Sequence, residues 1–339
     1  MPRLNKTLDI SSSPTVIAVQ TCLCILLLIT GVLGNGIICY LVIRFKALRT
    51  IPNILLTNLA AIDLLNIITN TPMIMLIFVY NVKAQQEIRA SLWPVFLVIA
   101  FTQLNLSSML LLVLDRYFVL AHSLKYRLWR TQRKTFCAIC AVWVWALFIS
   151  GYVVSSANDT QLRQTAPEKP FYGAIGKRLG FHINPLHVAI IVLTPNFIFS
   201  ILTIREILKK KTLNTSSNSL QNLRRNGKRT QRTNHRSAIT IIIVLLVYAV
   251  CFLCGSSFAA TASVSDSRQW FFATVTARLC GSTCNSVIYN VRSTEFRNAL
   301  RQTFKCNRVF NNRVYTCQKN AGKVFYIKSA FGRKVVVVE

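Results

Sequence analysis

Residues 92–117 read LWPVFLVIAFTQLNLSSMLLLVLDRY. The stretch up to Leu114 is apolar and long enough to cross a hydrocarbon core of ~30 Å as a helix. An acid and a base, Asp115 and Arg116, follow at once, with Tyr117 after them. Charges are costly inside a membrane, so a pair at this point requires a reason. The segment predicts a membrane-spanning helix that ends in a charged site.

The composition of the whole chain is that of a membrane protein. Of its 339 residues 53% are hydrophobic and 15% are charged, and the mean hydropathy is +0.43. Seven apolar runs have spanning length, at roughly 16–43, 51–80, 92–118, 135–157, 183–208, 238–263 and 270–292. Helices are favoured because each backbone donor must be bonded within its own segment, and barrel strands are only about 10 residues long. We predict an all-α membrane protein, a seven-transmembrane helix bundle with a short amphipathic eighth helix.

The basic residues predict the orientation of this bundle. If the amino terminus lies outside, the cytoplasmic segments hold 30 of the 40 Lys and Arg residues. Such an excess marks the cytoplasmic side. We expect an extracellular terminus (1–15), a bundle (16–292, with a third cytoplasmic loop at about 209–236), an amphipathic helix (293–306) and a disordered cytoplasmic tail (307–339). The glycosylation sequons at Asn5 and Asn158 then lie outside the cell.

The net charge of +30 does not by itself indicate a nucleic-acid partner. Basic segments beside a membrane meet anionic inner-leaflet lipids, at about 1 kcal/mol per residue, so we expect membrane lipids as partners and no nucleic acid. Four scattered histidines show no pairing with a nucleophile and no metal-ligand spacing. Cysteine pairs within the apolar runs are typical of small buried hydrophobes. We therefore predict no enzyme activity, no metal and no cofactor.

Polar residues recur at fixed places in the predicted spans. The first span contains Gly34 and Asn35, the second Asn58 and Asp63, the third Asp115, Arg116 and Tyr117, and the seventh Asn285 and Tyr289; an amphipathic stretch and Cys306 follow. In this order the set resembles the rhodopsin-like (class A) G-protein-coupled receptors over about residues 16–306. Cys306, at the end of a surface helix, is a candidate for palmitoylation.

The resemblance implies a polar core around Asp63. A buried acid needs hydrogen-bond donors, which Asn35, Asn105 and Asn285 can supply. In the family the matching acid helps to bind sodium, but Asn105 and Gly281 differ from the usual polar set. We therefore predict no sodium site. Two roles stay open for Asp63: an acid that couples the ligand site to the cytoplasmic side, as the resemblance implies, and a buried acid that is only hydrogen-bonded.

The resemblance also implies the residues of an activation switch. Arg116, paired with Asp115 in the inactive state, would contact the G protein when the sixth helix moves outward. The alternative is an arginine at the membrane boundary whose side chain extends to the polar surface. Tyr289 matches a tyrosine that swings inward, and Pro195 a proline that loosens the fifth helix. Either could serve packing alone.

Several positions depart from the family pattern. Phe252 replaces the toggle tryptophan of the sixth helix, Cys254 its kinking proline and Ser286 a proline of the seventh helix. Asn234 stands where many members carry an acid that pairs with the arginine of the third helix. The ion pairing that holds Arg116 in the inactive state should therefore be weaker, which predicts raised basal activity.

Two positions bear on the ligand. Val98 stands where amine receptors carry an aspartate, which disfavours an amine. Arg278 lies seven residues before Asn285, about two turns of helix, so it should face the bundle. A charge there is a candidate for binding an anionic group of the ligand, and a bridge toward Asp63 or a path to the outer surface is the alternative.

These observations predict a plasma-membrane receptor that binds an extracellular, non-aminergic ligand, with an acidic group as one candidate chemistry, and activates a heterotrimeric G protein. The alternative is a seven-helix binding protein, or a homo- or hetero-dimer partner, without G-protein signalling. A transporter ranks below both because the spans show no internal repeat.

Overall fold

The computed structural model describes residues 14–75, 93–122, 126, 128–156, 185–215, 224–265, 268–310, 324–328 and 334–338. At some positions within these ranges, Cys306 among them, it describes the backbone without the side chain. The chain divides into two compact units, Met1–Arg292 and Ser293–Glu339.

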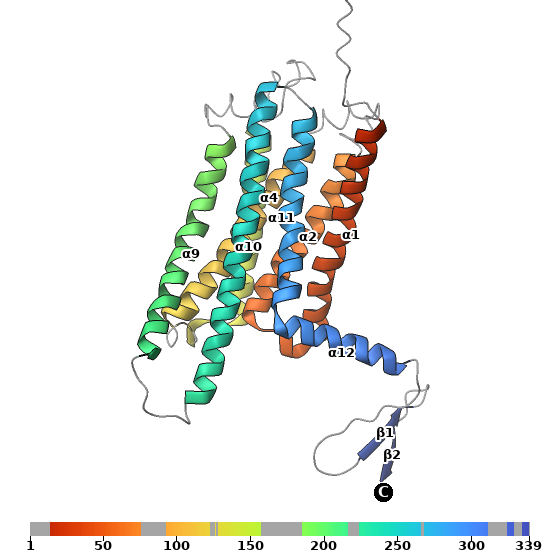
Figure 1. Ribbon diagram of the computed structural model, residues 1–339, viewed down its shortest axis with the longest axis vertical. Coiled ribbons are helices and arrows are strands. Elements are labelled where there is room, and N and C mark those ends of the chain that lie inside the picture. The colour runs from red at the N-terminus through yellow and green to blue at the C-terminus, as the bar shows by residue number, and fades with distance from the viewer. Residues whose placement is uncertain are drawn as a thin grey trace, which may run out of the picture. The chain divides into compact units, whose positions relative to one another are not determined.

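Long helices make up the described part of the first unit. They are α1 (Pro14–Arg44), α2 (Ile51–Ile74), α4 (Trp93–Ala121), α6 (Gln132–Ser156), α9 (Pro185–Thr215), α10 (Arg224–Ser265) and α11 (Arg268–Arg292), with a 3-10 turn η2 (Lys46–Leu48) after α1 (Figure 1). The predicted helical bundle is confirmed. α10 begins well before the apolar run at 238, because a helix bonds its own backbone and can continue beyond the hydrocarbon layer.

Five of the described helices, α1, α2, α4, α6 and α10, are long and apolar enough to cross a membrane by themselves. α11 is less apolar because it carries buried polar side chains, among them Thr274, Ser282 and Asn285. Such residues are tolerated where a helix faces other helices rather than lipid. α9 and α11 lie within the bundle, α9 against α4 and α10, and α11 against α1 and α10.

The helices close into a ring in the order α1, α2, α4, α9, α10, α11, and α11 returns to α1. α4 contacts α2, α6, α9 and α10, so the helix that carries Asp115 is central (Figure 1). Among the described helices, α6 packs mainly against α4 and α2, and most of its apolar stretch is not buried inside the protein. Its other face, with Trp145 and Phe148, is exposed, as expected of a surface that meets lipid.

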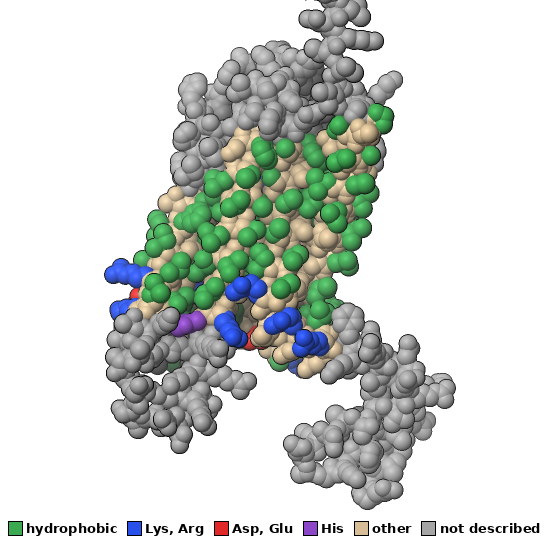
Figure 2. Space-filling model, viewed as in Figure 1, with side chains coloured by type: hydrophobic (Ala, Val, Ile, Leu, Met, Phe, Trp, Pro, Cys, Tyr) green, Lys and Arg blue, Asp and Glu red, His purple; other side chains and the backbone are tan. Residues whose placement is uncertain are grey.

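Apolar side chains cover the described helices of the first unit on the face seen in Figure 2, and Lys and Arg gather at one end of them. We call this the basic end: it is where α1 ends at Arg44, α11 ends at Arg292, and α4 carries Arg116 near its last turn. Among the described residues of the bundle, Lys and Arg are therefore concentrated at one end (Figure 2).

Buried polar side chains tie the central helices together. Nε1 of Trp143 on α6 donates to Oδ1 of Asn58 on α2 at 3.0 Å, and Nδ2 of Asn58 donates to Oγ of Ser108 on α4 at 3.0 Å. One amide thus satisfies groups from three helices, and such bonds between membrane helices contribute ~1 kcal/mol each. They specify which faces meet, since apolar contacts alone do not distinguish one helix from another.

The second unit contains helix α12 (Thr294–Phe310) and strands β1 (Val324–Lys328) and β2 (Lys334–Val338). α12 is the predicted amphipathic helix and runs a turn further than expected. The strands pair antiparallel, with Val324 opposite Val338. The valine run near the end of the chain thus forms a hairpin strand, where we expected disorder, because β-branched residues suit a pleated surface.

Gly34 permits close packing of α1 and α11. Nδ2 of Asn290 on α11 donates to the Gly34 carbonyl at 3.1 Å, and a Cβ at Gly34 would lie 3.0 Å from Cβ of Ser286. Gly36, two residues on, has no atom within 4 Å of the corresponding position. We therefore predict that Gly34→Ala destabilises the protein by about 1–3 kcal/mol through overpacking.

Thermal unfolding of the purified protein in detergent, followed by circular dichroism, measures this destabilisation. The matched control, Gly36→Ala, should unfold at or slightly above the wild-type temperature, because Ala is the better helix former and meets no atom there. Equal shifts for both variants would contradict the packing argument.

Candidate functional site

A buried pair of charges lies in the last turns of α4, at the basic end. Asp115 is 3% exposed and Arg116 is 4% exposed. Nη2 of Arg116 lies 3.3 Å from Oδ2 of Asp115, so the two side chains form an ion pair. Tyr117, the next residue, packs the edge of its ring against Phe199 of α9 at a centroid distance of 5.7 Å. The Asp115–Tyr117 motif therefore makes contacts within α4 and with the neighbouring helix α9.

Two further groups contact Asp115 from the segment between α4 and α6. Nη2 of Arg130 lies 2.6 Å from Oδ1 of Asp115, and the hydroxyl of Tyr126 donates to the same oxygen at 3.3 Å. The carboxylate thus has two cations and a phenol around it. Burial of a charge is tolerated only with such partners.

Aromatic packing holds Tyr126 in place. Its ring stacks on Phe118 at 5.4 Å, and the guanidinium carbon of Arg130 lies 5.7 Å from the centre of the Tyr126 ring. Burial raises the pKa of Tyr126 to about 12, and the negative charge of Asp115 adds to the rise. The hydroxyl therefore stays protonated at neutral pH and remains a donor to Asp115.

Our sequence analysis did not identify Tyr126 and Arg130. They follow Asp115 in a segment without the hydrophobic period that locates a helix face. The available signal was weak: Tyr126 and Arg130 occur in a stretch, 116–134, that contains several bases and no acid. Which of these bases turns toward Asp115 depends on the path of the chain.

The predicted polar core forms around Asp63, which is fully buried on α2. Nδ2 of Asn285 on α11 donates to Oδ2 of Asp63 at 3.3 Å, and the side chains of Ser282 and Asn105 also hydrogen-bond to the acid. Asn35 does not join them, because its amide donates to the Gly31 carbonyl of its own helix at 3.0 Å. Three helices, α2, α4 and α11, thus meet at one carboxyl group.

The other predicted switch residues lie on α9, α10 and α11. Pro195 lies inside α9, which continues through it. Tyr289 is buried and lines a small cavity between α4 and α10 with Leu112 and Leu245. Phe252 is buried on α10 and stacks on Tyr248 at a centroid distance of 6.0 Å.

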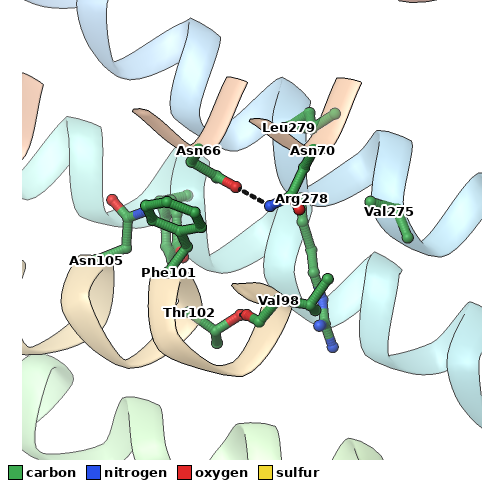
Figure 3. A pocket seen from close by; sticks show the side chains of 10 residues that line it. Asn66, Asn70, Val98, Phe101, Thr102, Asn105, Val275, Arg278 and Leu279 are labelled. Carbon is green, nitrogen blue, oxygen red and sulfur yellow. Dashed lines mark hydrogen bonds between the residues drawn. The ribbon is translucent and has the colours of Figure 1, made fainter. Parts of the chain in front are cut away.

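A second polar site lies nearer the other end of the bundle. Its cavity has a volume of about 20 Å³, and side chains of α2, α4, α10 and α11 line it: Asn66, Asn70, Val98, Phe101, Thr102, Asn105, Tyr248, Val275, Arg278 and Leu279 (Figure 3). None of these ten described residues is acidic. The predicted positions of Val98 and Arg278 are thus brought together, and Arg278 faces the interior as expected.

Arg278 contacts the side chain at the toggle position. Its guanidinium carbon lies 5.3 Å from the centre of the Phe252 ring, within the range of a cation–π interaction. Gly255 leaves room for it, since a Cβ there would lie 3.2 Å from Cγ of Arg278. A cavity of this volume holds about one water molecule, so a larger ligand requires these side chains to move.

Hydrogen bonds connect this cavity to the polar core. The amide of Asn70 donates to Asn66, and Nδ2 of Asn66 donates to Oγ of Ser282 at 3.4 Å. Ser282 in turn bonds to Asp63. The sites predicted separately from the sequence are therefore linked through α2 and α11.

Three predicted modification sites lie outside what the structure describes. Asn5 and Asn158 are outside the described residues, and Cys306 is within α12 without a described side chain.

The model of the 7 transmembrane receptor (rhodopsin family) matches residues 34–289. The chain therefore belongs to the rhodopsin family of seven-transmembrane receptors. It is a multi-pass membrane protein of a family of G-protein-coupled receptors.

Curated relatives include receptors for amines and opsins. The chain is 25% identical to Octopamine receptor beta-2R of Chilo suppressalis, over 87% of this chain and 82% of that receptor. It is 22% identical to Dopamine receptor 1 of Drosophila melanogaster, over 81% of this chain and 60% of that receptor. A shorter match, 31% identical to Melanopsin-A of Gadus morhua, covers 34% of this chain and 21% of the relative.

The polar core generates a prediction about stability. Asn285→Ala removes a donor from the buried Asp63, which should cost about 1–3 kcal/mol because the carboxyl group loses a hydrogen bond that water cannot replace. The loss appears as a lower unfolding temperature in detergent. Val287→Ala, on the exposed face of the same helix, is the matched control. A variant of Asn285 that unfolds no earlier than this control would refute the role of the amide.

Proposed function

We propose that the chain is a plasma-membrane receptor, with its amino terminus outside, that binds a small extracellular ligand through an anionic group and activates a heterotrimeric G protein. The observation that carries the proposal is Arg278. It lines an interior cavity without an acidic side chain and touches Phe252, at the position where the family has its toggle residue.

The charge distribution supports the orientation. The basic end of the bundle is the cytoplasmic end by the positive-inside rule. The Arg278 cavity then lies toward the extracellular side, and the sequons at Asn5 and Asn158 are exposed to glycosylation.

An anionic ligand suits the cavity better than an ammonium group. Arg278 is its one charged lining residue among those described, and an amine would meet a like charge there. The octopamine and dopamine receptors are relatives, yet Val98 offers no carboxylate where amine receptors have one. Asn66, Asn70 and Thr102 can donate further hydrogen bonds to a carboxylate.

Ligand binding would act through Phe252. A carboxylate that pairs with Arg278 competes with the aromatic face for the same guanidinium, and charge-assisted pairs are the stronger contact. Release of Phe252 would alter the packing of α10 on α11. The ligand favours whichever bundle conformation it binds more tightly. The difference in Arg278 and Phe252 contacts between the two conformations would therefore couple ligand binding to the basic end.

At the basic end the moving element would be α10. Nε of Arg292 on α11 donates to Oγ1 of Thr240 on α10 at 3.4 Å, a weak bond that an outward shift of α10 can break. Arg116 would then be exposed to backbone carbonyls of the G protein, for which its permanent charge suits it.

A binding protein without G-protein signalling is the second candidate. The observation that favours it is the segment from Cys251 to Cys254, in which Phe252 and Cys254 replace the family's tryptophan and proline and α10 stays helical throughout. Nucleotide exchange separates the two candidates.

Arg116→Ala tests the coupling. We expect agonist-free nucleotide exchange, measured across a panel of G proteins at equal surface expression, to fall to the level of empty membranes. The physical reason is the loss of the cation that would enter the G-protein contact. Exchange by the variant equal to that of the wild type would contradict the proposal, and no exchange by either would favour the non-signalling candidate.

Arg278 tests the ligand chemistry. A library of small carboxylic acids, each paired with its methyl ester, is screened for stimulated exchange. We expect acids to act and esters to fail, and Arg278→Gln to lower the potency of an active acid about tenfold or more, since a charged hydrogen bond contributes ~1.5–3 kcal/mol.

The control variant is Arg278→Lys, which keeps the charge and should retain part of the potency. Activation by amines that is unaffected by Arg278→Gln would contradict the anionic ligand and leave the coupling intact.

A further inference from the structure

We infer that Arg130 is a positioning residue for nucleotide exchange: it draws the carboxylate of Asp115 away from Arg116 and so keeps Arg116 loosely held. The inference rests on the proposed coupling through Arg116. It concerns a residue in the segment between α4 and α6, not one on α10.

The distances show how the carboxylate is shared. Oδ1 of Asp115 lies 2.6 Å from Arg130 and also accepts the hydroxyl of Tyr126, whereas Oδ2 lies 3.3 Å from Arg116. The attraction between opposite charges weakens as the distance between them grows. The closer cation is therefore Arg130, although Arg116 is the neighbour in sequence.

Burial makes this competition matter. The side chains of Arg116, Asp115 and Arg130 are 5%, 3% and 16% exposed. Charges so poorly screened act strongly on one another. The cluster has two positive charges and one negative charge, so Arg130 repels Arg116 as well as taking up its partner. Both effects loosen Arg116.

The backbone holds Arg130 in this position. Its N–H donates to the carbonyl of Tyr126, and the N–H of Tyr126 donates to the carbonyl of His122, both at 2.9 Å. These helical bonds place the two side chains one turn apart, where Arg130 also lies over the Tyr126 ring. Tyr126 is stacked on Phe118 of α4. Tyr126 and Arg130 are thus anchored to α4, the helix that carries Arg116.

The rest of the described chain does not compensate. Asp115 is the only acid paired with Arg116 among the described residues. At the place on α10 where many family members have a second acid, the sequence has Asn234. How firmly Arg116 is held therefore depends on how the Asp115 carboxylate is shared between Arg116 and Arg130.

The experiment is a double-mutant cycle on agonist-free nucleotide exchange at equal surface expression. Arg130→Gln should lower exchange about three- to tenfold, because Asp115 can then turn fully to Arg116. Asp115→Asn should raise exchange above that of the wild type. In the Asp115→Asn background, Arg130→Gln should lower exchange by a smaller factor than in the wild type, because only the direct repulsion between the two arginines is then removed.

Two control variants separate this role from a structural one. Arg130→Lys keeps a cation near Asp115 and should restore most of the wild-type exchange. Arg133→Gln removes the same charge from an exposed position three residues on, and its effect should add to that of Asp115→Asn without coupling. A folding role alone would lower surface expression and would not depend on Asp115.

A rise in exchange for Arg130→Gln would overturn the inference, because Arg130 would then restrain Arg116. Exchange by wild type and Asp115→Asn that equals empty membranes would also overturn it. A thermal unfolding cycle on the purified receptor, without G protein, distinguishes the two failures. Coupling between Arg130 and Asp115 in that cycle, with no exchange anywhere, would refute the proposed coupling to G proteins. If the unfolding cycle shows no coupling between Arg130 and Asp115, the role of Arg130 is refuted, and the proposed G-protein coupling is not.

Discussion

The structure depends on the constraint that polar groups in a hydrocarbon layer must find partners inside the protein. The helices satisfy their own backbones, and the remaining polar side chains turn inward. Asn58 bonds to Trp143 and Ser108, and Asp63 collects donors from α4 and α11. The outer faces can then be largely apolar, as on α6, where Trp145 and Phe148 are exposed. The polar contacts determine which helix faces meet, and the apolar surface determines only that the helices stay in the membrane.

The same constraint organises function along the bundle. Ionisable groups are found at three depths: Arg278 beside its cavity, Asp63 in the core and Asp115 with its two arginines at the basic end. Hydrogen bonds through Asn66 and Ser282 connect the first two. Each group is held by contacts that a small shift of α10 or α11 would change. Buried charges are therefore suited to couple the two ends of the bundle, because a helix shift at one end changes their contacts.

Much of the fold and of the candidate site could be predicted. The helices follow from apolar runs of spanning length, and the charged end from the placement of Lys and Arg. Arg278 was expected to face the bundle because it lies two turns from Asn285 on one helix. The partners of Asp115 in the segment before α6 could not be found in this way. Tyr126 and Arg130 belong to the short connection between α4 and α6, whose sequence has no repeating apolar pattern that indicates the direction of a side chain.

The sequence by itself determined that this chain spans a membrane, which end is basic and which polar residues lie in each helix, because these follow from local length, hydropathy and helical spacing. Only the tertiary structure decided that Asn35 bonds to its own helix while Asn285 reaches Asp63, that Arg278 lies on Phe252, and that Asp115 is shared between two arginines. Apart from the bond of Asn35, these contacts join different helices, or α4 and the connection that follows it. They depend on how the helices rotate and pack, which the periodicity of a single helix does not specify.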